Sequence, residues 1–274
     1  MPKLAANLTM LFNEIDFLDR FAAAAKAGFE GVEYLFPYDY DKNLLREHLQ
    51  ENRLTQVLHN LPAGNWAAGE RGIGCHPDRI SEFETGVDKA IEYATALGCK
   101  QVNCLAGVRP SGLDPVDARE TFVKNLQFAA TRLQAVGIKL LIEAINTRDI
   151  PGFFLCNTQQ AVDIIKAVGS GNLFVQYDIY HMQIMEGDLA PTIEKHLKLI
   201  PHMQLADTPG RHEPAPAKSI TIFCCRTSTS SATRAGSAAN TSRRAKQSTA
   251  SAGRSLTCGK AERRKERDER RKNA

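Results

Sequence analysis

The sequence predicts an eight-stranded β/α barrel in which parallel strands alternate with helices. From residue 3 to about residue 207, strand-like and helix-like segments follow one another, and the alternation repeats seven times. The strand-like runs are apolar on both faces, which is typical of parallel strands covered by helices. Such alternation requires parallel pairing through right-handed crossovers. The alternative, a doubly wound open sheet, is disfavoured because no glycine-rich dinucleotide fingerprint follows the first strand.

The elements can be placed in order along the chain. Strands are expected at Lys3–Leu8, Gly31–Pro37, Leu54–Asn60, Gln101–Gly107, Lys139–Asn146, Leu173–Tyr180 and His202–Asp207. Helices are expected at Phe17–Gly28, Asp41–Arg53, Pro77–Leu97, Asp114–Val136, Thr158–Val168 and Asp188–Ile200. Several helices end in glycine, the residue that a left-handed C-terminal cap favours.

The distribution of charge divides the chain into two regions. Residues 215–274 hold 15 of the 35 Lys and Arg but 4 of the 31 Asp and Glu, so they carry about +11 and residues 1–214 about −7. The first region is predicted to be the barrel domain, with seven β/α units. The second is a basic, low-complexity tail, rich in Ser, Thr, Ala and Arg, with no visible eighth unit. The basic net charge therefore does not indicate a nucleic-acid-binding domain.

The chain shows no targeting or disulfide signature. Its 7 cysteines are odd in number and lack paired spacing, so they are expected to be reduced thiols. The N-terminus lacks a charged segment followed by an apolar core, and no run of about 18 apolar residues occurs. We expect a cytoplasmic protein without a membrane partner.

Three β-like runs within the predicted strands, Lys139–Glu143, Leu173–Asp178 and His202–Gln204, end in side chains with oxygen donors, and these suggest a metal site. The donors are Glu143, Asp178 and Gln204. Polar groups at the carboxyl ends of parallel strands lie where β/α barrels place their active sites. Oxygen-rich ligation suits Mg²⁺ or Mn²⁺ better than zinc. Each residue taken alone could instead be a strand-end polar group facing water, but three on separate strands favour metal-assisted chemistry.

The tail has a further interpretation, an out-of-frame product. With permitted codons, restoring one nucleotide before Ala215 lets residues 215–225 read Gly-Thr-Gly-Glu-Ile-Asn-Tyr-Asp-Phe-Leu-Leu. In the same frame, residues 236–244 read Trp-Ile-Gly-Cys-Glu-Tyr-Lys-Pro-Pro. We predict a frameshift after Pro214 that removes the last β/α unit and leaves a disordered tail. A solvated charged segment or a binding arm for an acidic partner are the alternatives.

Residues 1–214 closely resemble the hydroxypyruvate isomerase family, within the sugar isomerase and endonuclease IV-like TIM barrels. The stretches that carry the resemblance are Phe36-Pro-Tyr-Asp-Tyr, Leu58-His-Asn-Leu-Pro-Ala-Gly, Trp66-Ala-Ala-Gly-Glu-Arg-Gly, Leu141-Ile-Glu-Ala-Ile-Asn, Gln176-Tyr-Asp-Ile-Tyr-His-Met-Gln and Arg211-His-Glu-Pro. The resemblance implies conversion of hydroxypyruvate to tartronate semialdehyde through an enediolate. It implies a metal held by Glu143, Asp178, Gln204 and a glutamate of the eighth strand, with Glu143 and that glutamate as proton carriers.

The eighth-strand glutamate is absent from this chain. In the shifted frame its codon is in register with Asn240. Activity is therefore expected to be impaired, and a barrel without an eighth strand would leave two parallel edges unpaired. An improvised strand at Ser219–Cys225 could occupy the gap.

Other residues are candidates for substrate contacts. His181 follows Asp178 by three residues, in an expected loop, where the family would use it beside the metal; a loop histidine bonded to backbone is the alternative. Arg211 could bind a substrate carboxylate through two parallel hydrogen bonds, or be a solvated loop residue.

Two further pairs are weaker candidates. Glu70 and Arg71 lie in a glycine-containing loop and could form a substrate wall or lid. His59 and Asn60 end the third strand and could face the site, although loops and strand ends are polar for ordinary reasons.

Three functions remain open from the sequence. The first is the isomerase, acting on a small hydroxy-oxo acid, either as a monomer or as a homo-oligomer. The second is an endonuclease IV-like metal phosphodiesterase, which needs several metals and a basic groove that the acidic body does not suggest. The third is an inactive truncated remnant.

Overall fold

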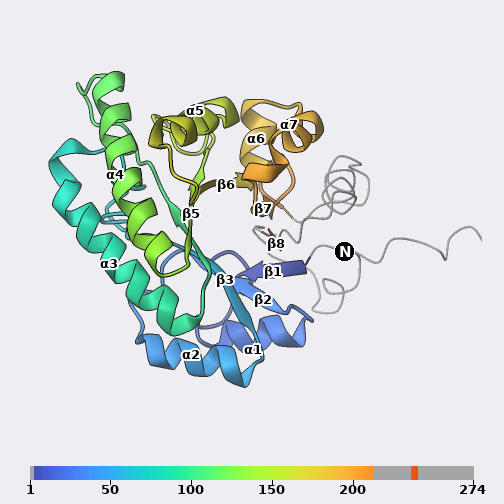
Figure 1. The fold of residues 1–274 in the computed structure, drawn as a ribbon. Coiled ribbons are helices and arrows are strands. Elements are labelled where there is room, and N and C mark those ends of the chain that lie inside the picture. Colours follow the sequence, from blue (N-terminus) through green and yellow to red (C-terminus); the bar gives the residue numbers. More distant parts are fainter. Residues whose placement is uncertain (1–2, 213–235, 240–274) are drawn as a thin grey trace, which may run out of the picture. The chain divides into compact units, whose positions relative to one another are not determined.

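The structure is a computed structural model that describes residues 3–212 and 236–239. Within the unit formed by residues 1–243, eight parallel strands close into a barrel in the order β1 to β8. Helices lie outside the strands, and consecutive helices pack against one another from α1 to α5 (Figure 1). The fold predicted from the alternating pattern is therefore confirmed.

The strands are short, and neighbouring strands are consecutive in sequence. They are β1 (Lys3–Asn7), β2 (Gly31–Glu33), β3 (Thr55–Asn60), β4 (Gln101–Cys104), β5 (Lys139–Glu143), β6 (Leu173–Asp178), β7 (His202–Leu205) and β8 (Gly236–Ala239). Several end earlier than the sequence predicts, because the apolar runs continue into loops. Consequently Glu143 and Asp178 are the last residues of their strands.

Apart from α6, which the sequence did not predict, the helices follow the predicted ranges closely. They are α1 (Asp19–Lys26), α2 (Lys42–Glu51), α3 (Ile80–Leu97), α4 (Pro115–Ala135), α5 (Thr158–Val168), α6 (Ile179–Met185) and α7 (Leu189–His196), with short 3₁₀ turns at Pro77–Arg79 and Leu197–Leu199. Side chains cap several N-termini; Asp114, for example, accepts a hydrogen bond from the Val116 amide at 2.7 Å. At the other end of α3, Gly98 has φ of 69°, the left-handed conformation that glycine adopts without strain.

Strand β8 corrects the expectation of an open barrel. Gly236–Ala239 pairs in parallel with both β7 and β1, so the two edges predicted to be unpaired are paired in the structure. Backbone pairing does not depend on side-chain identity, which explains how a Gly-Ser-Ala-Ala segment without a strand pattern can occupy this place. The expected improvised strand at Ser219–Cys225, like Asn240, lies outside the described residues.

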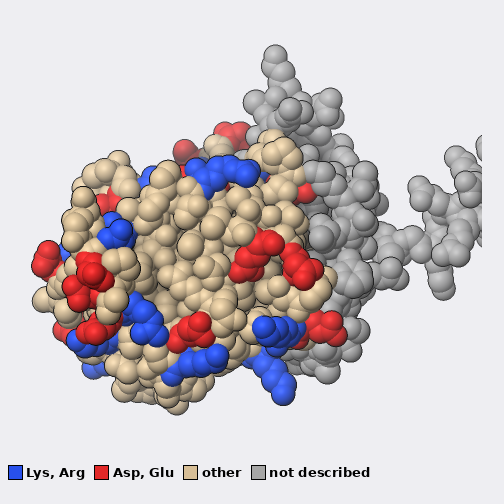
Figure 2. Space-filling view, turned by 90° about the horizontal axis from the view of Figure 1, so that it is seen from above, with Lys and Arg blue, Asp and Glu red and all other residues tan. Residues whose placement is uncertain are grey.

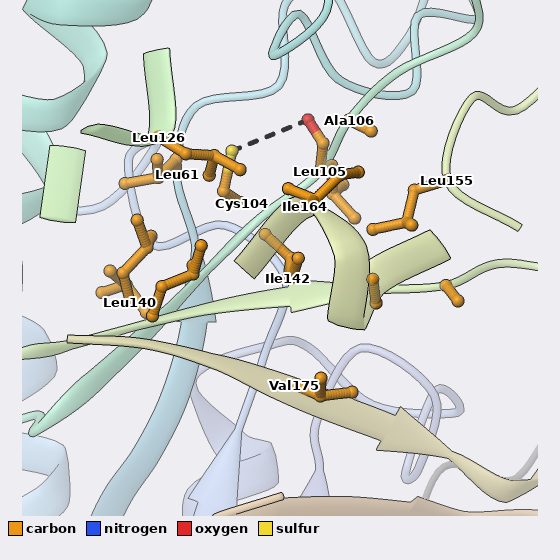
Figure 3. Close-up of a cluster of buried hydrophobic side chains, with 14 of the residues drawn as sticks. Leu61, Cys104, Leu105, Ala106, Leu126, Leu140, Ile142, Leu155, Ile164 and Val175 are labelled. Atoms are coloured by element: carbon orange, nitrogen blue, oxygen red, sulfur yellow. Dashed lines mark hydrogen bonds between the residues drawn. The ribbon is translucent and has the colours of Figure 1, made fainter. Parts of the chain in front are cut away.

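The main hydrophobic core fills the space between the barrel and helices α3, α4 and α5. Figure 3 shows its centre, where side chains from β4, β5 and β6 meet those of the helices; among them are Cys104, Leu126, Leu140, Ile142, Ile164 and Val175. A second cluster joins β1 and β2 to α1 and α2. These layers hold the strands in register, so that their carboxyl ends meet at one end of the barrel.

Two remaining expectations concern thiols and membranes. Cys75, Cys99, Cys104 and Cys156 are free, as predicted, and the other three cysteines lie outside the described residues. No helix in the described part of the chain has the length and apolar character of a membrane span.

Candidate active site

Two carboxylates and a histidine meet at the carboxyl ends of β5 and β6. Glu143 ends β5, Asp178 ends β6, and His181 lies in the first turn of α6; each is at most 5% exposed. One ligand atom from each lies within 4.8 Å of the others. The His181 Nε2 atom is 3.5 Å from Asp178 Oδ2 and 3.9 Å from Glu143 Oε1. We call Glu143, Asp178, His181 and Arg211 the carboxylate cluster.

The local fold explains why His181 joins this cluster. The sequence predicted a loop after Asp178, but the residues that follow form α6, which corrects that expectation. Asp178 caps the helix, because its Oδ1 accepts a hydrogen bond from the Tyr180 amide at 2.8 Å. The helical turn then places His181 beside the carboxylate that begins it, and leaves Asp178 Oδ2 directed at the cluster.

Arg211 provides the positive charge of the cluster. It follows β7 with φ of 56°, and its Nη2 donates to Asp178 Oδ2 at 2.8 Å. The same nitrogen is 3.4 Å from His181 Nε2, and the guanidinium lies 5.0 Å from the centre of the Tyr180 ring. Its side chain remains 20% exposed, so it can be reached from the mouth of the barrel.

A chain of side chains orients the His181 ring. Asn146 Nδ2 lies 2.6 Å from His181 Nδ1, and the same amide nitrogen donates to Asp149 Oδ2 at 3.0 Å. Asp149 also accepts a hydrogen bond from the Tyr180 hydroxyl at 2.9 Å. An amide nitrogen donates, so Nδ1 is the acceptor and the ring proton of neutral His181 is on Nε2, facing the two carboxylates.

Burial sets the protonation of the cluster. Burial, and after it the nearby charge of Asp178, raise the pKa of Glu143 to about 8, while Arg211 acts in the opposite direction. Burial lowers the pKa of His181 to about 4, although Asp178 partly offsets this effect. Glu143 thus has a pKa close to neutrality, and His181 is uncharged at neutral pH.

Gln204 lies next to Asp178 on the neighbouring strand, as their Cα atoms are register partners. Its Oε1 accepts a hydrogen bond from Gln176 Nε2 at 3.0 Å, and its Nε2 donates to Glu33 Oε1 at 2.6 Å. Gln176 also hydrogen-bonds the side chain of Glu143. The third predicted oxygen donor is therefore connected to the carboxylate cluster through Gln176.

The donor set fits a hard divalent cation. Two buried carboxylates lie close enough for the charge of Asp178 to disfavour ionisation of Glu143, and a cation would relieve this repulsion. The oxygens of Glu143, Asp178 and Gln204 are ligands that Mg²⁺ and Mn²⁺ accept, with His181 as a further donor.

The structure separates His59 from this site. Successive side chains of a strand point to opposite faces. Asn60 lies on the inner face, where Asn103 Nδ2 donates both to Asn60 Oδ1 at 3.1 Å and to Glu143 Oε2 at 3.2 Å. His59 faces the helices instead, against the Ala90 backbone, with its ring centre 6.0 Å from that of Tyr38. The expectation that His59 lines the site is corrected, and Asn60 is the residue of this pair on the face that carries Glu143.

Glu70 and Arg71 lie in the loop between β3 and α3. Glu70 pairs with Arg79, whereas the Arg71 guanidinium lies 4.4 Å from the centre of the Trp66 ring and donates to the Trp66 carbonyl at 3.1 Å. This loop packs closely against the loop that follows β4, since a Cβ atom at Gly72 would lie 2.6 Å from the Leu105 carbonyl oxygen. Both side chains thus bind partners in their own loop and in the 3₁₀ turn that follows it, and the structure does not bring them into the carboxylate cluster.

Sequence reasoning missed a second buried polar group, which we call the Glu33 network. It consists of Asn7, Glu33, Gln176, His202 and Gln204, each at most 3% exposed. Glu33 accepts from Asn7 Nδ2 at 2.9 Å and pairs with His202 Nε2 at 2.8 Å. A carboxylate within the apolar strand Gly31–Glu33 was the available signal.

Known proteins place the chain in a family. Residues 21–216 match the family described as Xylose isomerase-like TIM barrel. Over 214 residues the chain is 54% identical to hydroxypyruvate isomerase of Escherichia coli K12 (78% of this chain, 83% of the relative) and 48% identical to 2-oxo-tetronate isomerase of Cupriavidus necator (78% and 82%). A solved structure described as AP endonuclease, family 2, from Brucella melitensis superposes with a TM-score of 0.87 at 43% identity, covering 90% of this chain and 95% of that one. The chain therefore belongs to the xylose isomerase-like TIM barrel family, among its aldose–ketose isomerases.

Proposed function

We propose that this barrel interconverts hydroxypyruvate and tartronate semialdehyde (2-hydroxy-3-oxopropanoate) by proton transfer through an enediolate. The observation that carries the proposal is Glu143, a buried carboxyl group with a pKa near neutrality at the end of a barrel strand. A group that must both take and return a proton works best when its pKa is near the working pH. The names of the related isomerases support the substrate class.

The roles of the side chains follow from their positions. Glu143 would take the proton from the hydroxymethyl carbon of hydroxypyruvate, and a second carboxyl group, the glutamate of a frame-restored eighth strand, would deliver a proton to the neighbouring carbon. The hydroxyl proton would pass from one substrate oxygen to the other, so that the carbonyl moves by one position. His181, neutral with its proton on Nε2, would donate a hydrogen bond to the substrate oxygen that gains negative charge. Arg211 would bind the substrate carboxylate.

Glu143, Asp178 and Gln204 would hold the divalent cation, Mg²⁺ or Mn²⁺. Bound there, such a cation would supply electrostatic stabilisation of the enediolate charge, an effect worth several kcal/mol. Asp178 has a second role in this proposal, because its other oxygen caps α6 and so fixes the position of His181. Glu70 and Arg71 would form part of the wall above the substrate.

We further propose that residues 215–274 are an out-of-frame product. The family match ends at residue 216, close to the abrupt change in composition. Strand β8 begins at Gly236, which is also where the shifted frame would encode Trp-Ile-Gly-Cys, followed by glutamate in register with Asn240. An asparagine cannot carry a proton, so turnover by this chain is expected to be low. Sequencing the gene tests the frame: an uninterrupted reading with unrelated codons would contradict it.

An endonuclease IV-like phosphodiesterase is the competing function, because the similar Brucella structure is described as an AP endonuclease. The described residues contain one group of three or more His, Cys, Asp and Glu side chains suited to a metal ion. Phosphodiester cleavage of the endonuclease IV type needs several metal ions. The face seen in Figure 2 carries acidic and basic side chains interspersed rather than one basic surface. These observations favour the isomerase.

One comparison of enzymes tests the proposal. The chain and a frame-restored version are assayed with hydroxypyruvate, with 2-oxo-tetronate and with an abasic DNA duplex. The proposal expects isomerisation of hydroxypyruvate, faster in the frame-restored enzyme and abolished in both by a chelator. Preference for 2-oxo-tetronate would contradict the substrate, and DNA cleavage would contradict the reaction class.

A further inference from the structure

The buried Glu33 network lies beside the carboxylate cluster and is not explained by the proposed chemistry. Glu33 is the last residue of β2, yet its side chain contacts residues of β7. In the closed barrel, β1 and β8 lie between these two strands. Its Oε1 accepts hydrogen bonds from Asn7 and Gln204, and its Oε2 pairs with His202. A carboxylate held at 1% exposure by three partners has a defined position and little freedom to rotate.

The orientation of the Gln204 amide depends on Glu33. An amide has a donor end and an acceptor end, and an ionised carboxylate only accepts. The Gln204 Nε2 atom must therefore face Glu33, at 2.6 Å, and its Oε1 must point the other way. On that side Gln176 Nε2 donates to it at 3.0 Å, and Gln176 also hydrogen-bonds Glu143.

We infer that Glu33 is a positioning residue that makes Gln204 present its oxygen, rather than its NH₂ group, to the cation site formed with Glu143 and Asp178. The inference rests on the proposed function, because it concerns a ligand of the proposed cation. A cation can bind the carbonyl oxygen of an amide but is repelled by the amide hydrogens. The wrong orientation would therefore remove a ligand without any change in the fold.

Substitution of Glu33 tests this orientation directly. In Glu33→Gln the new amide can donate to Gln204 Oε1, so both orientations of Gln204 become available. The contact with His202 survives, since the new side chain still offers it an oxygen, whereas the hydrogen bond from Asn7 is lost because Asn7 Nδ2 then faces the new NH₂ group. Outer partners of metal ligands typically contribute about 10–100-fold to metal affinity, and we expect a loss in that range for Mn²⁺.

The decisive variant exchanges the two side chains, as Glu33→Gln combined with Gln204→Glu. The pair again consists of one amide and one carboxylate, so the hydrogen bond between positions 33 and 204 is kept. Position 204 now offers an oxygen in either orientation, and Mn²⁺ binding should recover. His202→Gln is the matched control: it alters the contact to the other Glu33 oxygen but leaves Gln204 oriented, and its Mn²⁺ affinity should equal that of the unaltered chain.

Binding is measured on the full 274-residue chain by the electron paramagnetic resonance signal of free Mn²⁺, with urea unfolding of the metal-free proteins to confirm that each is folded. Weak binding by Glu33→Gln with recovery in the exchanged pair supports the inference. Unchanged affinity in Glu33→Gln, or equal loss in His202→Gln, would overturn it while the proposed isomerase stands. Failure of the exchanged pair to recover would also overturn it, because Glu33 would then act by its charge. If the unaltered chain binds no Mn²⁺, both the inference and the proposed cation site are wrong.

Discussion

Glu143→Gln should inactivate the enzyme and at the same time stabilise its metal-free fold at alkaline pH. The variant keeps the shape of the side chain and can still accept from Asn103 Nδ2, which lies 3.2 Å from Glu143 Oε2. It removes the group proposed to move the proton, so kcat should fall about 10²–10⁴-fold. It also removes a buried carboxyl group that must ionise next to Asp178.

The size of the stabilisation follows from the pKa of Glu143. Burial raises it from 4.5 to about 8 in the folded protein. Its folding contribution is therefore fully present below pH 4.5 and is lost as the pH rises towards 8, because the unfolded chain ionises first. The loss is about 1.4 kcal/mol per pH unit over that window, so the unaltered protein should lose a few kcal/mol that the glutamine variant does not.

Urea unfolding in a chelator at pH 5, 6.5 and 8 measures this difference. The free energy of unfolding of Glu143→Gln relative to the unaltered chain should be smallest at pH 5, about 1 kcal/mol or less, and should increase with pH. Glu47→Gln, at an exposed glutamate of α2, is the matched control and should change it by less than about 0.5 kcal/mol at any pH. A glutamine variant whose advantage is the same at pH 5 and pH 8 would show that Glu143 is not held in a charge-disfavouring environment.

Three further predictions concern single residues. Asn240→Glu should raise kcat for hydroxypyruvate at least tenfold, because it restores a proton carrier directly after β8, and unchanged turnover would contradict the assigned register. Arg211→Met should raise KM for hydroxypyruvate and move the Glu143 limb of the pH–rate profile to higher pH, since Arg211 lowers the pKa of Glu143; a profile that stays in place would count against that contact. His59→Gln should protect the fold against acid, because burial lowers the pKa of His59 to about 3, so that stability present above pH 6.5 is lost as the pH falls towards 3. The urea midpoints of variant and parent are compared at pH 7 and at pH 4.5; an equal difference at the two pH values would refute this.

The sequence predicted those features that depend on local pattern or on general rules for parallel sheets. The order of strands follows from the alternation of elements. Glu143 and Asp178 could be placed together because parallel strands end at the same side of a barrel. His59 and Asn60 could not be assigned to faces, because two adjacent polar residues between the apolar Leu58 and Leu61 give no alternation.

Other features depend on contacts between distant segments, which local pattern does not contain. Glu33 and His202 are 169 residues apart in sequence and pair only because the barrel closes. The sequence did not predict helix α6, which carries His181, because Asp178 was interpreted only as a metal ligand. In the structure the other oxygen of Asp178 caps α6. A residue with two roles can be recognised only when both of its partners are in place.

Closure of the barrel and assembly of its site depend on different parts of the eighth strand. Gly236–Ala239 pairs through its backbone with β7 and β1, so any segment able to adopt an extended conformation can fill this position. Glu33 adds side-chain contacts from β2 to His202 and Gln204 on β7, which join the two sides of the same gap independently of β8. The proposed cation site and proton transfer instead require particular side chains at the strand ends, and Asn240 does not supply a carboxylate. A change of reading frame after Pro214 can therefore leave a closed barrel with the three proposed metal ligands in place, while removing the second proposed proton carrier, on which we expect rapid isomerisation to depend.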